Sequence, residues 1–165
     1  MKKISNLNET LFKSFLLILL ILQTCFMPIK ANAEIAKTEI NSQIITASTE
    51  FLRDLDYETW QLVAYKSSLN DEKLILRIVG YPGSLRIDHP LDLNVESGRK
   101  QWMLNDLTLL NEQLANDSRQ AAAEFDLEYL MSDLSKNRPL RLSLEGVFSE
   151  LPVPPFLVEE WRSIG

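Results

Sequence analysis

The densest hydrophobic run after the N-terminal region, Leu74 to Gly80, predicts a strand that is buried on both faces. Arg77 is the single polar interruption in this run. Before it, Thr59 to Lys66 alternates between hydrophobic and polar positions, and the polar segment Ser67 to Glu72 separates the two. We therefore predict an antiparallel hairpin whose second strand is central in a sheet.

Turn-forming residues follow this central strand. Tyr81 to Ser84 has a proline at its second position and a glycine at its third, which predicts a type II turn. The alternation from Ser84 to Asp88 then predicts a strand with one face in water. Pro90 keeps His89 extended and ends this strand.

Two further strands are expected after Pro90. Leu91 to Glu96 alternates without exception and ends at Ser97-Gly98, so one of its faces packs on the core. Gln101 to Leu104 predicts a short strand that carries Trp102.

The next part of the chain has helical periodicity. A helix capped by Asn105 or Asp106 is predicted from three leucines that share one face: Leu107, Leu110 and Leu114. Residues 120–125 fit a helix or a strand equally, because alanines favour helix while Phe125 begins a new pattern. From Asp126 to Leu134 the spacing of leucine and methionine predicts a second helix.

A last hairpin and a terminal helix complete the pattern. Leu140 to Leu144 and Val147 to Val153 alternate on either side of Gly146, and Pro152 places the second arm at a sheet edge. Pro154-Pro155 then opens a helix with a hydrophobic stripe that ends at Ile164. We expect this helix to cover an open end of the sheet.

Together these elements predict an α+β fold that is mainly antiparallel β. The sheet is a small twisted sheet, a sandwich or a partly open barrel, with two or three short helices of which the last is C-terminal. Residues 34–50 are polar with scattered isoleucines, so we expect a flexible lead-in with at most one edge strand at residues 43–48. Residues 51–165 are predicted to form one globular domain, without repeats or internal linkers.

The N-terminus predicts a secretory signal peptide. Basic residues precede the hydrophobic stretch Phe15 to Leu22, and Ala31-Asn32-Ala33 has small residues at the positions before a cleavage site. An uncleaved membrane anchor would need a longer hydrophobic stretch, of about 20 residues. A lipoprotein acylated at Cys25 is disfavoured by Gln23 and Thr24, which are poor residues before a lipidated cysteine. We therefore expect cleavage after Ala33.

Cleavage would remove the only cysteine and would change the charge balance. The 165-residue chain has a net charge of −6, and residues 1–33 hold four of its 17 basic residues but only one of its 23 acidic residues, so the mature chain has a charge of −9. Export without disulfides favours a periplasm or a thylakoid lumen. The acidity disfavours nucleic acid and anionic lipid as partners, and no integral membrane segment is expected after cleavage.

Several segments of the mature chain resemble one family. They are residues 60–63 (WQLV), 76–83 (LRIVGYPG), 88–90 (DHP), 152–156 (PVPPF) and 160–161 (EW). In this order and spacing they resemble the small exported cyanobacterial proteins known as domain of unknown function 3122. The sequence departs at Tyr57-Glu58-Thr59, before Trp60, where that family usually has a glycine. The resemblance implies export, and it implies no activity, cofactor or catalytic residue.

Two groups of polar residues are candidates for metal binding or for acid–base catalysis. Asp54, Asp56 and Glu58 have the spacing of half a calcium loop, but the glycine of such a loop is missing, so we interpret them as a solvated turn and predict no metal site. His89 is the only histidine. Adjacent strand residues face opposite sides, so Asp88 would not pair with it, and no nucleophile motif accompanies it. We predict a structural His89, no catalytic residue and no cofactor.

Aromatic and basic residues indicate a binding surface. Trp60 and Trp161 are expected in the core, whereas Trp102, which follows the basic pair Arg99-Lys100, is expected to be the exposed tryptophan. That basic pair is a local exception in an acidic chain and could meet an acidic partner. The candidate binding residues are Tyr81, His89, Arg99, Lys100 and Trp102.

Two functional classes remain. The first is a non-catalytic binding or assembly module that docks on another exported or membrane-bound protein through its edge strand and the Trp102 region. The second is a small-molecule carrier or enzyme that uses a cavity near His89. A filled core would favour the first class, and a deep cavity with converging polar groups would favour the second.

Overall fold

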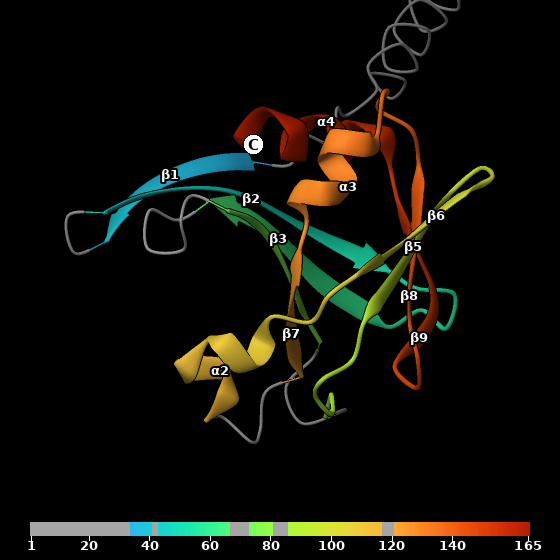
Figure 1. Cartoon of the computed structure of the whole chain (residues 1–165), viewed down its shortest axis with the longest axis horizontal. Coiled ribbons are helices and arrows are strands. Elements are labelled where there is room, and N and C mark those ends of the chain that lie inside the picture. Colours follow the sequence, from blue (N-terminus) through green and yellow to red (C-terminus); the bar gives the residue numbers. More distant parts are fainter. Residues whose placement is uncertain (1–33, 41–42, 67–72, 81–85, 117–120) are drawn as a thin grey trace, which may run out of the picture. The chain divides into compact units, whose positions relative to one another are not determined.

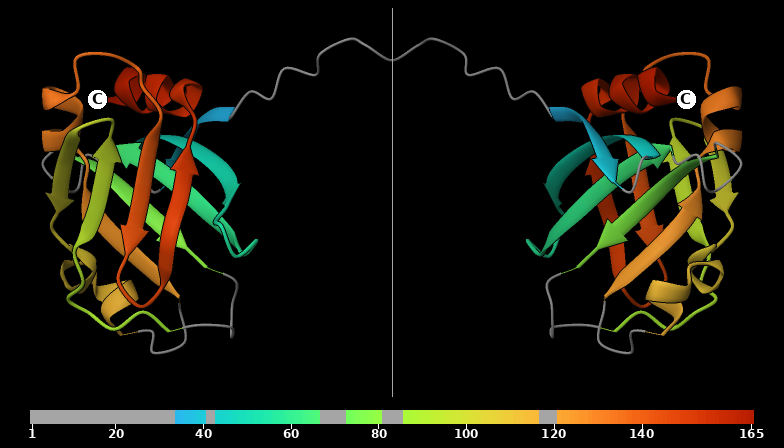
Figure 2. Two further views of the ribbon diagram at one scale, coloured as in Figure 1. Left: turned by 90° about the vertical axis from the view of Figure 1, so that its right-hand side faces the viewer. Right: turned by 90° about the vertical axis from the view of Figure 1, so that its left-hand side faces the viewer.

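A computed structural model describes residues 34–40, 43–66, 73–80, 86–116 and 121–165. They form two sheets in which all neighbouring strands are antiparallel. The first sheet has the order β1-β2-β3-β4-β7, with β1 Glu34–Ile40, β2 Gln43–Arg53, β3 Thr59–Lys66, β4 Leu74–Val79 and β7 Ala122–Asp126. The second has the order β6-β5-β8-β9, with β5 Leu93–Ser97, β6 Lys100–Leu104, β8 Leu140–Leu144 and β9 Phe148–Val153. Figures 1 and 2 show the two sheets from three sides.

In the described residues, four short helical segments accompany the sheets. They are the 3₁₀-helix η1 Thr108–Leu110 and the α-helices α2 Glu112–Ala115, α3 Glu128–Asp133 and α4 Pro155–Ile164. The fold is thus mainly antiparallel β with a C-terminal helix, as predicted. In the described part of the chain, no helix is both long and apolar enough to span a bilayer.

The two sheets are joined at one side by the chain that leaves β6. Leu107 N donates to Glu124 O of β7 at 2.7 Å, and Asp126 N donates to Asn105 O at 3.4 Å. At another point, Leu55 N of the β2–β3 loop donates to Glu150 O of β9 at 3.2 Å. Backbone hydrogen bonds therefore connect the sheets directly, so their relative position does not depend on side-chain packing alone.

One continuous core lies between these elements. It includes Leu62 and Leu76 of the first sheet, Leu142 of the second and Trp161 of α4, each 0% exposed. The rings of Trp60 and Phe148 lie 5.0 Å apart between centroids and bring β3 and β9 into contact. The core is therefore filled by large side chains from both sheets and α4.

Most predicted elements are confirmed. The β3–β4 hairpin places β4 inside the first sheet, and β5 and β6 form the next hairpin. Residues 126–134 contain α3, whose Leu130 and Met131 are buried. The β8–β9 hairpin ends at the sheet edge that Pro152 predicted, and α4 begins with Pro155 in its first turn. Of residues 120–125, which fitted either structure, Ala122 to Phe125 lie in strand β7 because β4 offers them a partner.

The prediction of a flexible lead-in at residues 34–50 was wrong. This segment forms β1 and most of β2, and β2 pairs with β3 from Thr46–Lys66 to Arg53–Thr59, so it is not an edge strand. The hydrophobic pattern did not indicate β2 because a polar residue occupies one of its buried positions. Ser48 is 0% exposed, and its Oγ donates to Glu160 Oε2 of α4 at 2.8 Å.

The strand predicted at residues 84–88 is not formed at Arg86 to Asp88. Ile87 is buried, as its hydrophobicity suggested. The backbone after it, however, forms a hydrogen bond with a side chain and not with a neighbouring strand. Leu91 N donates to Asp106 Oδ2 at 2.8 Å, and the His89–Pro90 peptide bond is cis. The predicted type II turn at residues 81–84 lies outside the described residues.

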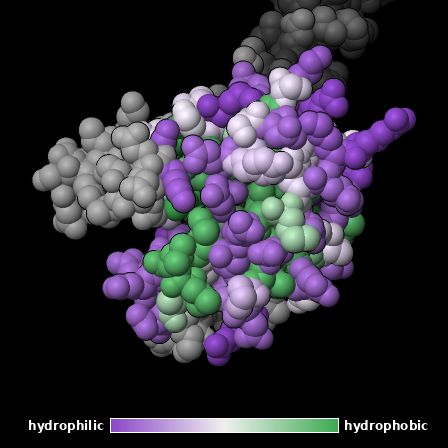
Figure 3. All heavy atoms as spheres, in the orientation of Figure 1, coloured by the Kyte–Doolittle hydropathy of each residue, from purple (hydrophilic) through white to green (hydrophobic). Residues whose placement is uncertain are grey.

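The single helix predicted after Asn105 is in fact two short segments, η1 and α2. The N-cap residue of η1 is Leu107, not Asn105 or Asp106, although Asp106 Oδ1 accepts from Thr108 N at 2.8 Å. Asn111 interrupts the helix and caps the second, because its Oδ1 accepts from Gln113 N at 3.1 Å. As a result Leu110 is 79% exposed and Leu109 56% exposed, and Figure 3 shows hydrophobic side chains gathered over η1 and α2.

Candidate functional site

His89 is held by a carboxylate far along the chain. Its Nδ1 lies 2.6 Å from Asp106 Oδ2, and the two side chains are 14% and 1% exposed. Burial alone would raise the pKa of Asp106, but hydrogen bonds from Thr108, His89 and Leu91 hold it below its ordinary value. Asp88 is not the partner, because its side chain is 95% exposed and lies 3.6 Å from Arg86. The pair fastens the loop before β5 to the start of η1.

The acidic turn that resembled half a calcium loop is organised by one buried side chain. Asp54 Oδ1 accepts from the backbone N of Asp56 and of Glu58, each at 2.9 Å. Its Oδ2 accepts from Trp60 Nε1 at 2.8 Å. The Asp54 carboxylate is therefore occupied by N–H donors. Among the described residues, no group of three histidine, cysteine or acidic side chains is placed to hold a metal ion.

A third buried carboxylate lies on the face of the first sheet opposite to the one that carries Leu62 and Leu76. Glu124 is 2% exposed and accepts from Arg77 Nε and from Tyr65 Oη, each at 2.7 Å. Asn111 Nδ2 also donates to it, at 3.1 Å. Burial and the hydrogen bond to Glu124 raise the pKa of Tyr65. This cluster explains the single polar residue of β4, Arg77, as the partner of a buried charge.

Trp60 and Trp161 lie in the core as predicted, but the prediction that Trp102 is exposed was wrong. Trp102 is 6% exposed. Its Nε1 donates to Asp133 Oδ2 of α3 at 3.0 Å, and Lys100 Nζ lies 2.9 Å from the same oxygen and 5.8 Å from the ring centroid. The indole is covered because α3 supplies a carboxylate that accepts its N–H. The sequence around Trp102 does not indicate this contact, because Asp133 is distant in sequence.

Beside Trp102 is a hollow of about 380 Å³, which we call the basic hollow. Four cations line it, Arg99 and Lys100 from the β5–β6 turn and Lys136 and Arg138 from the loop between α3 and β8. Gly98, at φ +64°, allows the tight turn that carries Arg99. Asp133 is the only acidic residue in the lining.

The loop that carries Lys136 and Arg138 is held at both ends. Arg162 of α4 donates to the carbonyl oxygens of Met131, at 3.3 Å, and Leu134, and to Asn137 Oδ1 at 3.0 Å. At the other end, Ser97 Oγ donates to Pro139 O at 3.1 Å. The cations are thus mounted on a fastened loop, which lowers the entropy lost when a partner binds.

The charges in the basic hollow do not cancel. Hydrogen bonds from Lys100 and then Trp102 hold the pKa of Asp133 below its usual range, so Asp133 is ionised and offsets Lys100. Within the described ranges, Arg99, Lys136 and Arg138 have no carboxylate within ion-pair distance. The hollow therefore has a positive charge on a chain whose net charge is −6.

The structure brings together only some of the candidate binding residues. Arg99, Lys100 and Trp102 line the basic hollow, His89 is not in its lining, and Tyr81 lies outside the described residues. Sequence reasoning missed Lys136, Arg138 and Asp133. A signal was present in Lys136-Asn137-Arg138, a basic loop that follows a predicted helix, but nothing local connected it with the β5–β6 turn.

Comparison with known proteins gives one match. The model of a family described as protein of unknown function (DUF3122) matches residues 33–164. No curated protein and no solved structure matches the chain.

Proposed function

This chain belongs to the DUF3122 family of proteins of unknown function, and we propose that it is a non-catalytic binding or assembly module. Its partner is an acidic surface of another exported or membrane-bound protein. Its main binding site is the basic hollow, and the edge strand β9, at the opposite edge of the same sheet from β6, offers a second contact. The family description carries no activity, so the proposal rests on the chain's own residues.

The basic hollow is the observation that carries this proposal. An acidic chain is repelled by acidic partners at long range, so a local group of cations determines both where and in which orientation such a partner can dock. Arg99 and Arg138 offer planar guanidinium groups that can bind carboxylates with two hydrogen bonds. The core supports a binding module over a carrier, because large buried side chains from both sheets and α4 pack together in it.

Export to a periplasm or a thylakoid lumen is part of the proposal. It is supported by the basic start, the hydrophobic stretch and Ala31-Asn32-Ala33. The resemblance to exported cyanobacterial proteins agrees with it. N-terminal sequencing of the protein recovered from its source cells should give Glu34 as the first residue. A chain that retains Met1, or one lipidated at Cys25, would contradict export by a cleaved signal peptide.

Charge reversal tests the binding site. The purified protein, immobilised, should retain a partner from a detergent extract of source-cell membranes, and Lys136→Glu combined with Arg138→Glu should abolish that retention. The matched control is Lys73→Glu combined with Arg86→Glu, which changes the net charge equally at exposed positions outside the hollow. Equal retention by both double variants would contradict the proposed site.

A carrier or enzyme that uses His89 is the alternative function. The observation in its favour is the buried Asp106 carboxylate on Nδ1, since a carboxylate in this position orients a histidine that acts as a general base. Against it, the nearby Thr108 hydroxyl donates to Asp106 at 2.5 Å and is therefore engaged. If His89→Gln abolished partner retention or turnover while leaving stability intact, this alternative would replace the binding module.

A further inference from the structure

The β2–β3 loop exposes large hydrophobic side chains at the end of its hairpin. Phe51 at the end of β2 is 62% exposed, and Leu55 and Tyr57 in the loop are 58% and 80% exposed. All three lie within seven residues of sequence. Several exposed hydrophobic side chains on one short segment are a feature of interaction sites, and tyrosine is enriched among residues that dominate binding.

This loop is held in one conformation by its own hydrogen bonds. Asp54 N donates to Glu58 O at 3.1 Å, and Tyr57 N donates to Asp54 O at 3.2 Å. The buried Asp54 carboxylate adds the bonds from Asp56 N and Glu58 N described above. Leu55 N also bonds to β9. The exposed side chains are therefore presented on a rigid support, which reduces the entropy cost of binding.

Tyr57 has an unusual backbone conformation. Its φ is +65°, in the left-handed region, and it is the only described residue other than glycine with a positive φ. A bulky side chain is unfavourable there, and a side chain that is 80% exposed contributes little packing in return. An unfavourable conformation that serves no packing is a reason to look for a role in binding.

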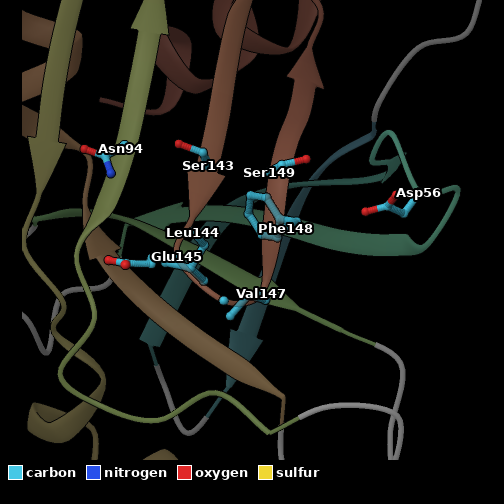
Figure 4. A pocket seen from close by; sticks show the side chains of 9 residues that line it. Asp56, Asn94, Ser143, Leu144, Glu145, Val147, Phe148 and Ser149 are labelled. Atoms are coloured by element: carbon cyan, nitrogen blue, oxygen red, sulfur yellow. The ribbon is translucent and has the colours of Figure 1, made fainter.

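A polar hollow of about 480 Å³ lies beside the loop. Figure 4 shows its lining, with Asp56 on the loop and the other side chains on β5, β8, β9 and the β8–β9 turn. The polar side chains are rich in acceptors: Asp56, Asn94, Ser143, Glu145 and Ser149. No basic side chain lines this hollow, so its two carboxylates favour a cationic group.

We propose that the β2–β3 loop and this hollow bind a segment of a partner protein that carries both basic and hydrophobic side chains. The hydrophobic side chains of the segment pack on Leu55 and Tyr57. A lysine or arginine side chain enters the hollow, where Asp56 at one end or Glu145 at the other compensates its charge. Because the same carboxylates repel phosphate groups, a nucleic acid or an anionic lipid surface does not fit. The site shares no lining residue with the basic hollow.

Synthetic peptides of alternating arginine and leucine, labelled with fluorescein, are the probe. Anisotropy titrations with the purified protein should show saturable binding. Arginine–serine and glutamate–leucine peptides of equal length should bind weakly. Tyr57→Gly, which keeps the left-handed turn but removes the ring, should weaken arginine–leucine binding roughly ten-fold or more, as for loss of an aromatic anchor. Asp56→Asn should weaken it about three-fold and reduce its salt dependence.

Two control variants make the result specific. Leu110→Ser removes an equally exposed hydrophobic residue elsewhere, and Glu128→Gln removes an exposed carboxylate outside the hollow. Both should bind the peptide like wild type. Arginine–serine binding as tight as arginine–leucine binding would overturn the proposal, and so would an equal loss in Leu110→Ser. Sedimentation that showed a dimer of the wild type and a monomer of Tyr57→Gly would also overturn it, because the occupant would then be a second copy of this chain.

Discussion

Replacing Asp106 by asparagine is expected to destabilise the protein by about 3–6 kcal/mol at neutral pH. Oδ2 of Asp106 receives His89 Nδ1 and Leu91 N, while Oδ1 receives the N and Oγ1 of Thr108. Asparagine keeps only one oxygen, and its amide N–H groups would face the other pair of donors. Each hydrogen bond to a charged acceptor contributes about 1.5–3 kcal/mol, so the loss of two at a buried site gives the estimate.

The effect should depend on pH with a definite sign. The folded-state pKa of Asp106 is lowered, so its carboxylate contributes stability that is fully present above the unfolded-state pKa, about 3.9, and is lost as pH falls through the folded value. The difference in unfolding free energy between wild type and Asp106→Asn should therefore be largest near pH 7. It should shrink below about pH 4.

Urea unfolding followed by tryptophan fluorescence measures this difference, because all three tryptophans are buried. Asp88→Asn is the matched control, since it removes a carboxylate whose side chain is 95% exposed, and it should change stability by less than about 0.5 kcal/mol. If Asp106→Asn lowered the unfolding free energy at pH 7 no more than Asp88→Asn does, the assigned hydrogen bonds would be wrong. They would also be wrong if Asp106→Asn lowered it equally at pH 7 and below about pH 4.

Substitutions at three other positions have defined expectations, each checked by urea unfolding. His89→Gln should lower stability by about 1 kcal/mol, the net value of one hydrogen bond, and leave partner retention within a few-fold of wild type. Leu76→Ala should cost about 2–5 kcal/mol because Leu76 is fully buried in β4, and an unchanged unfolding midpoint would contradict that position. Tyr57→Gly should be about 1 kcal/mol more stable than Tyr57→Ala, since only glycine adopts φ +65° without a Cβ penalty. Equal stability of these two variants would mean that the loop relaxes.

Periodicity predicted the elements whose partners are local in sequence. Alternation in residues 59–66 and the hydrophobic run in residues 74–79 predicted a hairpin, and Pro155 with the stripe through Ile164 predicted α4. The pattern failed where a polar side chain finds a distant partner. Ser48 is bonded to Glu160 and Trp102 to Asp133, contacts that span 112 and 31 residues, so a strand and a covered indole looked exposed in the sequence.

The basic hollow was only half predictable for the same reason. Arg99, Lys100 and Trp102 are neighbours in sequence, and their composition alone made them candidates. Lys136 and Arg138 reach the same place because α3 and the loop after it are held by Arg162 and Ser97. Such bonds depend on how the sheets are joined, which residue spacing does not encode.

The strand order has a consequence for the sequence of folding events. The β3–β4, β5–β6 and β8–β9 hairpins pair residues that are near in sequence and can form early. The pairing of Asn94 in β5 with Ser143 in β8, and that of Ile75 in β4 with Asp126 in β7, join residues that are distant in sequence. Such distant pairings slow folding, because loop-closure entropy is lost before their contacts form. The β5–β6 hairpin, which carries Arg99 and Lys100, can therefore form before the pairing of β5 with β8 brings Lys136 and Arg138 to it. The basic hollow is among the last features to assemble.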